Sequence, residues 1–141
     1  QGCRILIDYH EISIIGFLEV LKKYFHIKNR LNIAKKFIKT SKPQAVILVD
    51  FPGFNFIIGQ YAKKLGIKVI YYIPPQIWAW HYSLVNKMKK FADLVIPILP
   101  FETSIYAKEK LNHAYFGHPL IDNISVTQDK NSFYKKYKIY L

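Results

Sequence analysis

The sequence has 141 residues, enough for one domain with a buried core but too few for two domains of ordinary size. Apolar residues make up 51% and aromatic residues 16% of the chain, a composition that excludes an intrinsically disordered protein. Its 21 Lys and Arg residues outnumber its 9 Asp and Glu residues, for a net charge of +12. We therefore expect a surface that attracts phosphates, anionic lipid or nucleic acid. No apolar run reaches the roughly 18 to 20 residues that cross a bilayer, so any membrane contact should be peripheral.

The first third of the chain predicts helix followed by a buried strand. Apolar residues mark one helix face over residues 17–25 and another over residues 31–38, and Lys42 with Pro43 ends this pattern. Residues 45–49 are apolar at every position, which is typical of a strand buried on both faces.

Strand and helix patterns then alternate as far as residue 116. Residues 56–65 have helical spacing, and Gly66 stands where a glycine often ends a helix. Further strands are predicted at residues 69–73, 94–99 and, more weakly, 114–116, and further helices at residues 83–91 and 103–111, the second with Thr103 near its N-cap.

This alternation predicts an α/β fold: a Rossmann-like parallel sheet flanked by helices on both faces and joined by right-handed crossovers. We expect residues 1–124 to form this domain. The chain opens on Gln1 and soon enters a strand, so we expect the domain to be incomplete at its N-terminus. Residues 125–141 begin with a polar stretch and continue as a short basic helix, which indicates a linker and the start of a following domain.

The lysines are grouped, mostly within the helical patterns. The groups are Lys22 and Lys23, Lys35 and Lys36, Lys87 with Lys89 and Lys90, and Lys135 and Lys136. We consider first a solvated helix face in a lysine-rich protein, second a patch for anionic lipid, and third a nucleic-acid surface. The single cysteine, Cys3, excludes an internal disulfide and fits a reducing cytoplasm, where we expect it to be a small buried residue.

The residues that follow each predicted strand form the candidate site, because ligands of open parallel sheets bind beyond the carboxyl ends of the strands. These segments are residues 50–55, 74–80, 100–102 and 117–120. Asp50 ends an apolar strand, where partial desolvation would help it accept a proton from a hydroxyl. From the residues alone we favour the alternative, a turn aspartate that bonds nearby backbone amides. For Asn55 we favour a helix N-cap over a substrate contact.

The remaining candidates also have structural alternatives. Trp78 and Trp80 would stack on a sugar or acyl chain, or pack their loop onto the sheet, with one buried and one exposed if the loop is extended. For Glu102, beside a helix start, a structural role is favoured over catalysis. His118, between a glycine and a proline, binds phosphate or shapes a turn, and the turn is slightly favoured. The sequence has no metal-ligand spacing and no glycine-rich nucleotide loop, so we expect neither metal nor cofactor in this chain.

Taken in order, these segments resemble the lipid-A-disaccharide synthase family. The most specific matches are Pro-Gln-x-Trp-Ala-Trp at residues 75–80 and Asp-x-Pro-x-Phe-Asn at residues 50–55. The similar segments, which together cover nearly the whole chain, are residues 13–21, 49–55, 64–72, 75–80, 98–102 and 117–120. The chain departs from the family in having Pro74 where Ser is usual and His81 where Arg is usual.

The resemblance implies a metal-independent glycosyltransferase of the GT-B type, with this chain as part of its amino-terminal, acceptor-side domain. Such an enzyme transfers 2,3-diacylglucosamine from its UDP carrier to 2,3-diacylglucosamine 1-phosphate, forming the β-1,6 lipid A disaccharide and UDP. Asp50 would be the general base, and Asn55, Gln76, Trp78, Trp80, Glu102 and His118 would contact substrate. The implied location is the cytoplasmic face of the inner membrane, with the basic surface on anionic lipid. The chain alone, without the nucleotide-binding domain, is expected to be inactive.

Three alternatives remain at this point. Another GT-B transferase of envelope synthesis would share the fold, although the double-tryptophan loop argues against it. A basic α/β nucleic-acid-binding module would bind duplex or single strands with a steep salt dependence, whereas the synthase would prefer anionic liposomes. A truncated gene product that folds poorly would expose a sheet edge.

Overall fold

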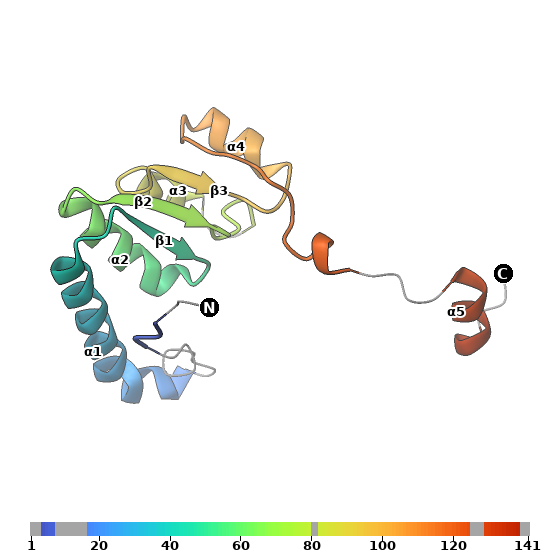
Figure 1. Cartoon of the computed structure of the whole chain (residues 1–141), viewed down its shortest axis with the longest axis horizontal. Helices are drawn as coiled ribbons and strands as arrows, with labels where there is room; N and C mark the ends of the chain where they lie inside the picture. Colours follow the sequence, from blue (N-terminus) through green and yellow to red (C-terminus); the bar gives the residue numbers. More distant parts are fainter. Residues whose placement is uncertain (1–3, 8–16, 80–81, 125–128, 139–141) are drawn as a thin grey trace.

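Three parallel strands form the centre of the structure, a computed structural model that describes residues 4–7, 17–79, 82–124 and 129–138. The strands are β1 (Ala45–Val49), β2 (Lys68–Tyr72) and β3 (Leu94–Ile96), in the order β1-β2-β3. Figure 1 shows the three arrows pointing the same way, with helices packed around them. The prediction of an α/β fold with a parallel sheet and flanking helices is confirmed.

Five α-helices lie among the described residues. They are α1 (Phe17–Ser41), α2 (Pro52–Lys64), α3 (Ser83–Met88), α4 (Glu102–Lys108) and α5 (Lys130–Tyr137), with a short 3₁₀ helix at Ile121–Asn123. The two apolar faces predicted before residue 41 belong to one helix, α1. Gly66, in the left-handed region at φ 74°, follows α2 as predicted. Figure 1 shows α5 apart from the sheet, beyond the segment that follows residue 124.

Several predicted bounds differ because of local backbone chemistry. The strand expected over residues 94–99 stops at Ile96, because Pro97 has no N–H to donate to the ladder. Residues 114–116 form no strand. Instead Val95 makes a single parallel bridge with His113, and the Ala114 N–H donates to the Val95 carbonyl at 3.1 Å. The helix expected at residues 103–111 begins one residue earlier, at Glu102, and ends at Lys108.

An aromatic cluster fills the space between α2 and the sheet. The Phe56 ring meets Tyr71 of β2 at 5.9 Å and Phe91 at 5.3 Å between centroids, both edge to face. Burying a side chain of this size contributes about 1.5 to 3 kcal/mol. Gly59 of α2 faces Phe91 and Leu48 with no room for a side chain, so the helix lies directly against the sheet. This packing holds α2 against the sheet directly after the turn between β1 and α2.

The opposite face of β1 is open among the residues that the structure describes. Leu48 points toward α2 and is buried, whereas Ile47 is 64% exposed and Val49 is 48% exposed. The prediction that this strand is buried on both faces is therefore wrong within the described part of the chain. β1 is also one of the two edge strands of the described sheet.

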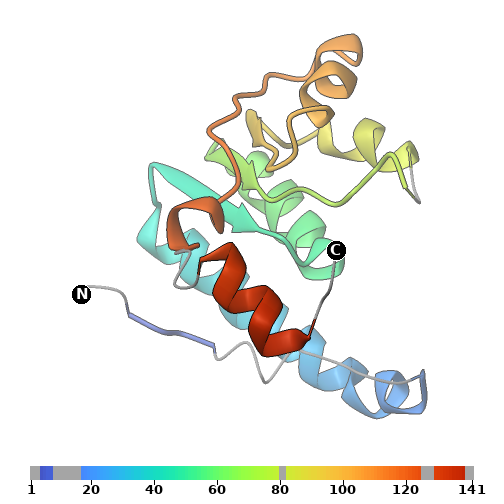
Figure 2. The same cartoon turned by 90° about the vertical axis from the view of Figure 1, so that its right-hand side faces the viewer.

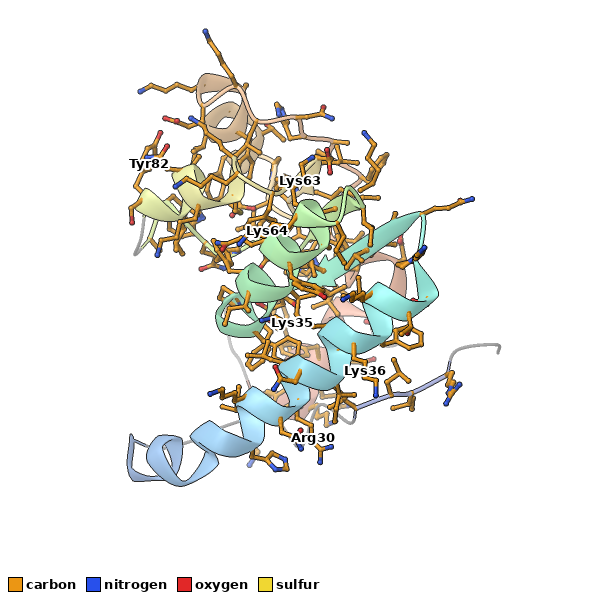
Figure 3. The ribbon with its side chains drawn as sticks, turned by 90° about the vertical axis from the view of Figure 1, so that its left-hand side faces the viewer. Arg30, Lys35, Lys36, Lys63, Lys64 and Tyr82 are labelled. Atoms are coloured by element: carbon orange, nitrogen blue, oxygen red, sulfur yellow. The ribbon has the colours of Figure 1, made fainter. Side chains whose placement is uncertain are left out.

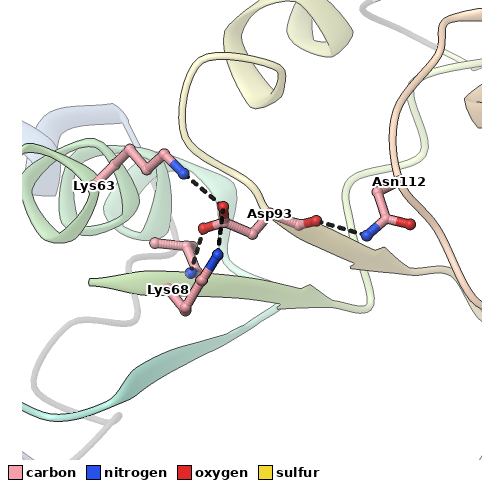
Figure 4. A network of polar contacts seen from close by, with 5 residues as sticks. Lys63, Lys68, Asp93 and Asn112 are labelled. Atoms are coloured by element: carbon pink, nitrogen blue, oxygen red, sulfur yellow. Dashed lines mark hydrogen bonds and ion pairs between the residues drawn. The ribbon is translucent and has the colours of Figure 1, made fainter. Parts of the chain in front are cut away.

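Asp93 ties α2, β2 and β3 together at the amino ends of the strands (Figure 4). Its carboxylate accepts a hydrogen bond from Lys63 Nζ at 2.6 Å and one from the Val69 N–H at 2.9 Å. Its backbone carbonyl accepts a bond from Asn112 Nδ2 at 3.0 Å. Burial alone would raise the pKa of the Asp93 carboxyl, but the donors Lys63 and Val69 hold this pKa below its ordinary value.

We expect the contribution of Asp93 to stability to depend on pH. A carboxyl whose pKa is lowered by folding stabilises the native state above its ordinary pKa of 3.8, and this stabilisation is lost as the pH falls. The Asp93→Asn variant should therefore unfold at a lower urea concentration than wild type at pH 7, and the difference should shrink below about pH 4. Asp122→Asn, at an exposed position, is the control. If the difference in urea midpoint between Asp93→Asn and wild type does not change with pH, the substitution acts through packing and not through the charge of Asp93.

Candidate functional site

The carboxyl ends of the strands bring the predicted site segments to one edge of the sheet. Asp50 directly follows β1, the loop with Gln76 and Trp78 follows β2, and Glu102 begins α4 after β3. Figure 2 faces the edge toward which the strands point in Figure 1. Trp80 and His81 lie outside the described residues, as does Cys3.

The turn after β1 has an unusual backbone. Asp50 and Phe51 both lie in the left-handed region, at φ 48° and 42°, and Ile73 after β2 does so at φ 53°. Such a conformation costs a residue other than glycine roughly 1 to 2 kcal/mol, and it persists only where the surroundings enforce it. The ladder reaches into the turn, since the Asp50 N–H donates to the Tyr72 carbonyl at 3.1 Å.

Two side chains hold this turn by its carbonyl groups. Asn55 Nδ2 donates to the Val49 carbonyl at 2.9 Å and to the Asp50 carbonyl at 2.8 Å. The Tyr71 hydroxyl donates to the same Asp50 carbonyl at 3.0 Å. The N-cap prediction for Asn55 is wrong, because α2 begins at Pro52 after Phe51, and Asn55 is inside its first turn. Burial, and then the charge of Asp50, raise the pKa of the Tyr71 hydroxyl, which keeps it a donor.

The Asp50 carboxylate is left free by these contacts. The residue is exposed, and its carboxylate has no hydrogen bond or ion pair with the residues that the structure describes. The expected desolvation is therefore not seen, and neither is the alternative of a turn aspartate bonded to backbone amides. The geometry presents a solvent-exposed carboxylate on a fixed turn at the sheet edge, suited to accept a proton from a bound hydroxyl.

Glu102 fastens the loop after β2 to the start of α4. The side chain is buried, 1% exposed, and Oε1 accepts a hydrogen bond from Trp78 Nε1 at 3.2 Å. Oε2 accepts a bond from the Leu99 N–H at 3.4 Å. Burial raises the pKa of this carboxyl, and the two donors partly offset the rise. Both oxygens of Glu102 are thus engaged within the chain, so its contact with a substrate stays a prediction.

Trp78 is held with one part of its ring at the surface. It is 47% exposed and meets Phe101 edge to face at 5.2 Å between centroids. Its indole N–H is used by Glu102, so the exposed part offers an apolar surface to a ligand. Gln76 is exposed in the same loop. His118 accepts a bond from the Leu120 N–H at 3.2 Å, the contact of a turn residue.

Two buried tyrosines, Tyr71 and Tyr106, lie beneath the candidate site. Neither was identified from the sequence. The sequence pattern places Tyr71 in an apolar strand and gives no sign that its hydroxyl holds the Asp50 turn. Tyr106 of α4 is buried, and its hydroxyl has no hydrogen-bond partner within the described residues. Burial, followed by the charge of Glu102 and then Tyr71, raises the pKa of the Tyr106 hydroxyl. No sequence signal separates these residues from ordinary core aromatics.

No group of three or more His, Cys, Asp or Glu side chains arranged to hold a metal occurs in the parts of the chain that the structure describes. In the same parts, no helix is both long and apolar enough to cross a membrane.

Comparison with known proteins gives the relationship. A family described as lipid-A-disaccharide synthetase matches residues 1–140. The chain belongs to the lipid-A-disaccharide synthetase family. Three of its similar relatives are named lipid-A-disaccharide synthase: those of Sulfurihydrogenibium sp. (strain YO3AOP1), Trichlorobacter lovleyi and Coxiella burnetii (strain Dugway 5J108-111), which are 41%, 40% and 34% identical over 141, 131 and 138 residues. These alignments cover 98%, 92% and 98% of this chain.

The chain spans only part of these family members. The alignments cover 36%, 34% and 37% of the Sulfurihydrogenibium, Trichlorobacter and Coxiella proteins. The family match and the identities confirm the resemblance to the lipid-A-disaccharide synthase family. The comparisons do not test individual site residues, so the roles of these residues stay predictions: Asp50, Asn55, Gln76, Trp78, Trp80, Glu102 and His118.

Proposed function

We propose that this chain is the acceptor-side part of a lipid-A-disaccharide synthase. In this proposal the enzyme transfers 2,3-diacylglucosamine from UDP to 2,3-diacylglucosamine 1-phosphate, and it forms the β-1,6 disaccharide and UDP without a metal. Residues 1–124 belong to the acceptor-side domain, and residues 125–141 lead toward a nucleotide-sugar domain. The enzyme works at the cytoplasmic face of the inner membrane.

The exposed Asp50 carboxylate is the observation that carries this proposal. It is free of partners among the described residues, on a turn fixed by Asn55 and Tyr71. A proton acceptor of this kind matches what an incoming sugar hydroxyl needs. As the 6-oxygen of the acceptor bonds to the anomeric carbon of the donor, the bond from that carbon to UDP breaks. The hydroxyl proton passes to Asp50, and UDP leaves with the bonding electron pair.

The loop after β2 supports the same function. Glu102 and Phe101 hold Trp78 so that part of its ring faces outward on the same edge as Asp50. An aromatic surface at the same sheet edge as a general base suits an acylated sugar, since the ring packs against the sugar face or the start of an acyl chain.

Release of UDP tests the proposal directly. We expect the complete reading frame that contains this chain, purified in detergent, to release UDP when UDP-diacylglucosamine and diacylglucosamine 1-phosphate are both present. Omission of the acceptor should abolish release beyond slow hydrolysis. Release that depends on another acceptor would favour a different envelope transferase. Tight, salt-sensitive binding to single-stranded or duplex DNA without UDP release would favour the nucleic-acid-binding alternative.

A further inference from the structure

A groove between α2 and α3 begins at Pro52 and Gly53, beside the Asp50 turn, and runs away from it along α2. It has a volume of about 840 Å³ and its floor includes Phe56, Ile57 and Leu84, while Lys64, Lys87 and Lys90 line it as well. Phe56 is buried and Ile57 is exposed, so the groove has an apolar floor open to solvent. Apolar surface beside clustered lysines is the chemistry that recognises an amphiphile with an anionic head.

The apolar and basic residues are separated along the groove. On α2 the lining residues follow one stripe of the helix, from Pro52 through Phe56 to Lys64. On the other side Leu84 precedes Lys87 and Lys90. α2 and α3 each connect neighbouring parallel strands, so they run in the same direction. Lys64 of α2 therefore lies at the same end of the groove as Lys87 and Lys90. At a rise of about 1.5 Å per residue, α2 carries its stripe over roughly 16 Å between Gly53 and Lys64.

The groove lysines are available for an anion. Lys63 is paired with Asp93, and Lys89 is paired with Glu109 at 2.6 Å, so neither is counted. Lys64, Lys87 and Lys90 are exposed and have no ion pair with the residues that the structure describes, and no acidic residue lines the groove. Figure 3 labels Lys63 and Lys64 on α2 and Lys35 and Lys36 on α1, the helix that packs against α2. Lysines at helix C-termini are favoured by the helix dipole, but the dipole gives no reason for the exposed apolar floor.

We propose that this groove binds an anionic phospholipid of the membrane surface. The phosphate lies among Lys64, Lys87 and Lys90, and the first part of an acyl chain lies on Phe56, Ile57 and Leu84. A nucleic acid would use the lysines but not the apolar floor, and a free phosphate would not use it either. The proposal extends the membrane contact of the proposed function to one defined place, and it rests on that function only for the choice of a membrane lipid over another amphiphile.

The position of the groove gives the lipid a consequence for the site. Pro52 and Gly53 line the groove and follow Asp50 by two and three residues. The apolar end of the groove is therefore the end nearest the Asp50 turn, so a lipid held along α2 would direct its acyl chain toward that turn, on the side from which an acylated acceptor arrives. The groove is thus a docking site that orients the protein, separate from the group that accepts the proton.

Vesicle flotation of the complete protein tests the electrostatic half of the proposal. The triple variant Lys64→Gln, Lys87→Gln, Lys90→Gln should bind phosphatidylglycerol vesicles at least about 10-fold more weakly than wild type, since each lysine near an anionic surface adds roughly five-fold in affinity. Lys39→Gln, Lys42→Gln, Lys108→Gln removes the same charge from exposed positions outside the groove and should retain at least half of the wild-type affinity. Equal losses in the two variants would overturn the proposal in favour of a diffuse charge effect.

A probe in the groove tests the apolar half. With Cys3 replaced by Ala, an environment-sensitive dye on Ile57→Cys should shift to the blue with phosphatidylglycerol vesicles, and the same dye on Lys108→Cys of α4 should not. Phosphatidylcholine vesicles, inorganic phosphate and single-stranded DNA should leave the Ile57→Cys signal unchanged. A shift with phosphate or DNA, or no shift with the anionic vesicles, would overturn the assignment of a lipid.

The detergent assay of UDP release separates this proposal from the proposed function. The triple groove variant should release UDP in detergent at about the wild-type rate, because none of its substitutions touches the Asp50 turn. If wild type releases UDP but the groove tests fail, the groove is rejected and the transferase stands. If the groove tests succeed and no UDP is released, the transferase is rejected.

Discussion

Replacement of Asp50 by Asn in the complete protein is expected to lower kcat at least about 100-fold, the usual contribution of a positioned general base. Asn tolerates the left-handed backbone of this position, and the contacts that Asn55 and Tyr71 make to the Asp50 carbonyl do not involve its side chain. The turn should therefore survive, and KM for the acceptor should change less than about three-fold. Steady-state UDP release at several acceptor concentrations measures both constants.

Asp122→Asn is the matched control for this experiment. It makes the same chemical change at an exposed position in the short 3₁₀ helix and should retain wild-type turnover. Unchanged kcat in Asp50→Asn would remove Asp50 from the mechanism. A rise in KM with kcat unchanged would make Asp50 a binding residue that does not accept the proton.

Gly59→Ala is expected to destabilise the fold by about 3 kcal/mol, at the upper end of the usual cost of overpacking. A Cβ atom at position 59 would lie 2.5 Å from Phe91 Cδ2, 2.6 Å from Phe91 Cε2 and 2.9 Å from Leu48 Cδ1. All three atoms belong to the packed layer between α2 and the sheet, so relief requires the helix to move. Such a loss is a large part of the roughly 5 to 15 kcal/mol of a typical domain.

Gly53→Ala is the control within the same helix. No atom lies within 4 Å of a Cβ built at Gly53, and the substitution should be neutral or stabilising by about 0.5 kcal/mol. Urea unfolding of both variants, followed by tryptophan fluorescence, gives the two free energies of unfolding. If Gly59→Ala matches Gly53→Ala, the close approach of α2 to Phe91 is not a determinant of stability.

The elements of the fold were largely predictable because each buried strand is a run of apolar residues. Ala45–Val49 matches β1 at both ends. The predicted bounds are wrong where one backbone group ends an element. Pro97 has no N–H to donate, so β3 ends earlier than the apolar run predicts. Burial on both faces was inferred from composition, and the exposed Ile47 shows that an apolar strand does not by itself determine what covers it.

The candidate site was predictable in position but not in its contacts. Parallel strands place their following loops on one edge, so the segments with Asp50 and Trp78 could be assigned to it in advance. The left-handed conformation of Phe51 has no sequence signature. Because of this turn, Asn55 does not cap the helix, and its side chain instead donates a hydrogen bond to the Asp50 carbonyl. Contacts such as Tyr71 to Asp50 join residues far apart in sequence, and only tertiary structure reveals them.

Among the residues that the structure describes, no strand pairs with the outer edge of β1, and this open edge links folding to association. Along this strand, backbone groups point away from β2, and the side chains of Ile47 and Val49 are exposed. Any polypeptide that adds a strand there binds the native state and not the unfolded chain, so it raises the apparent stability in proportion to the logarithm of its concentration. The cooperative unit that unfolds is then larger than the sheet alone, and damage to one partner weakens the other.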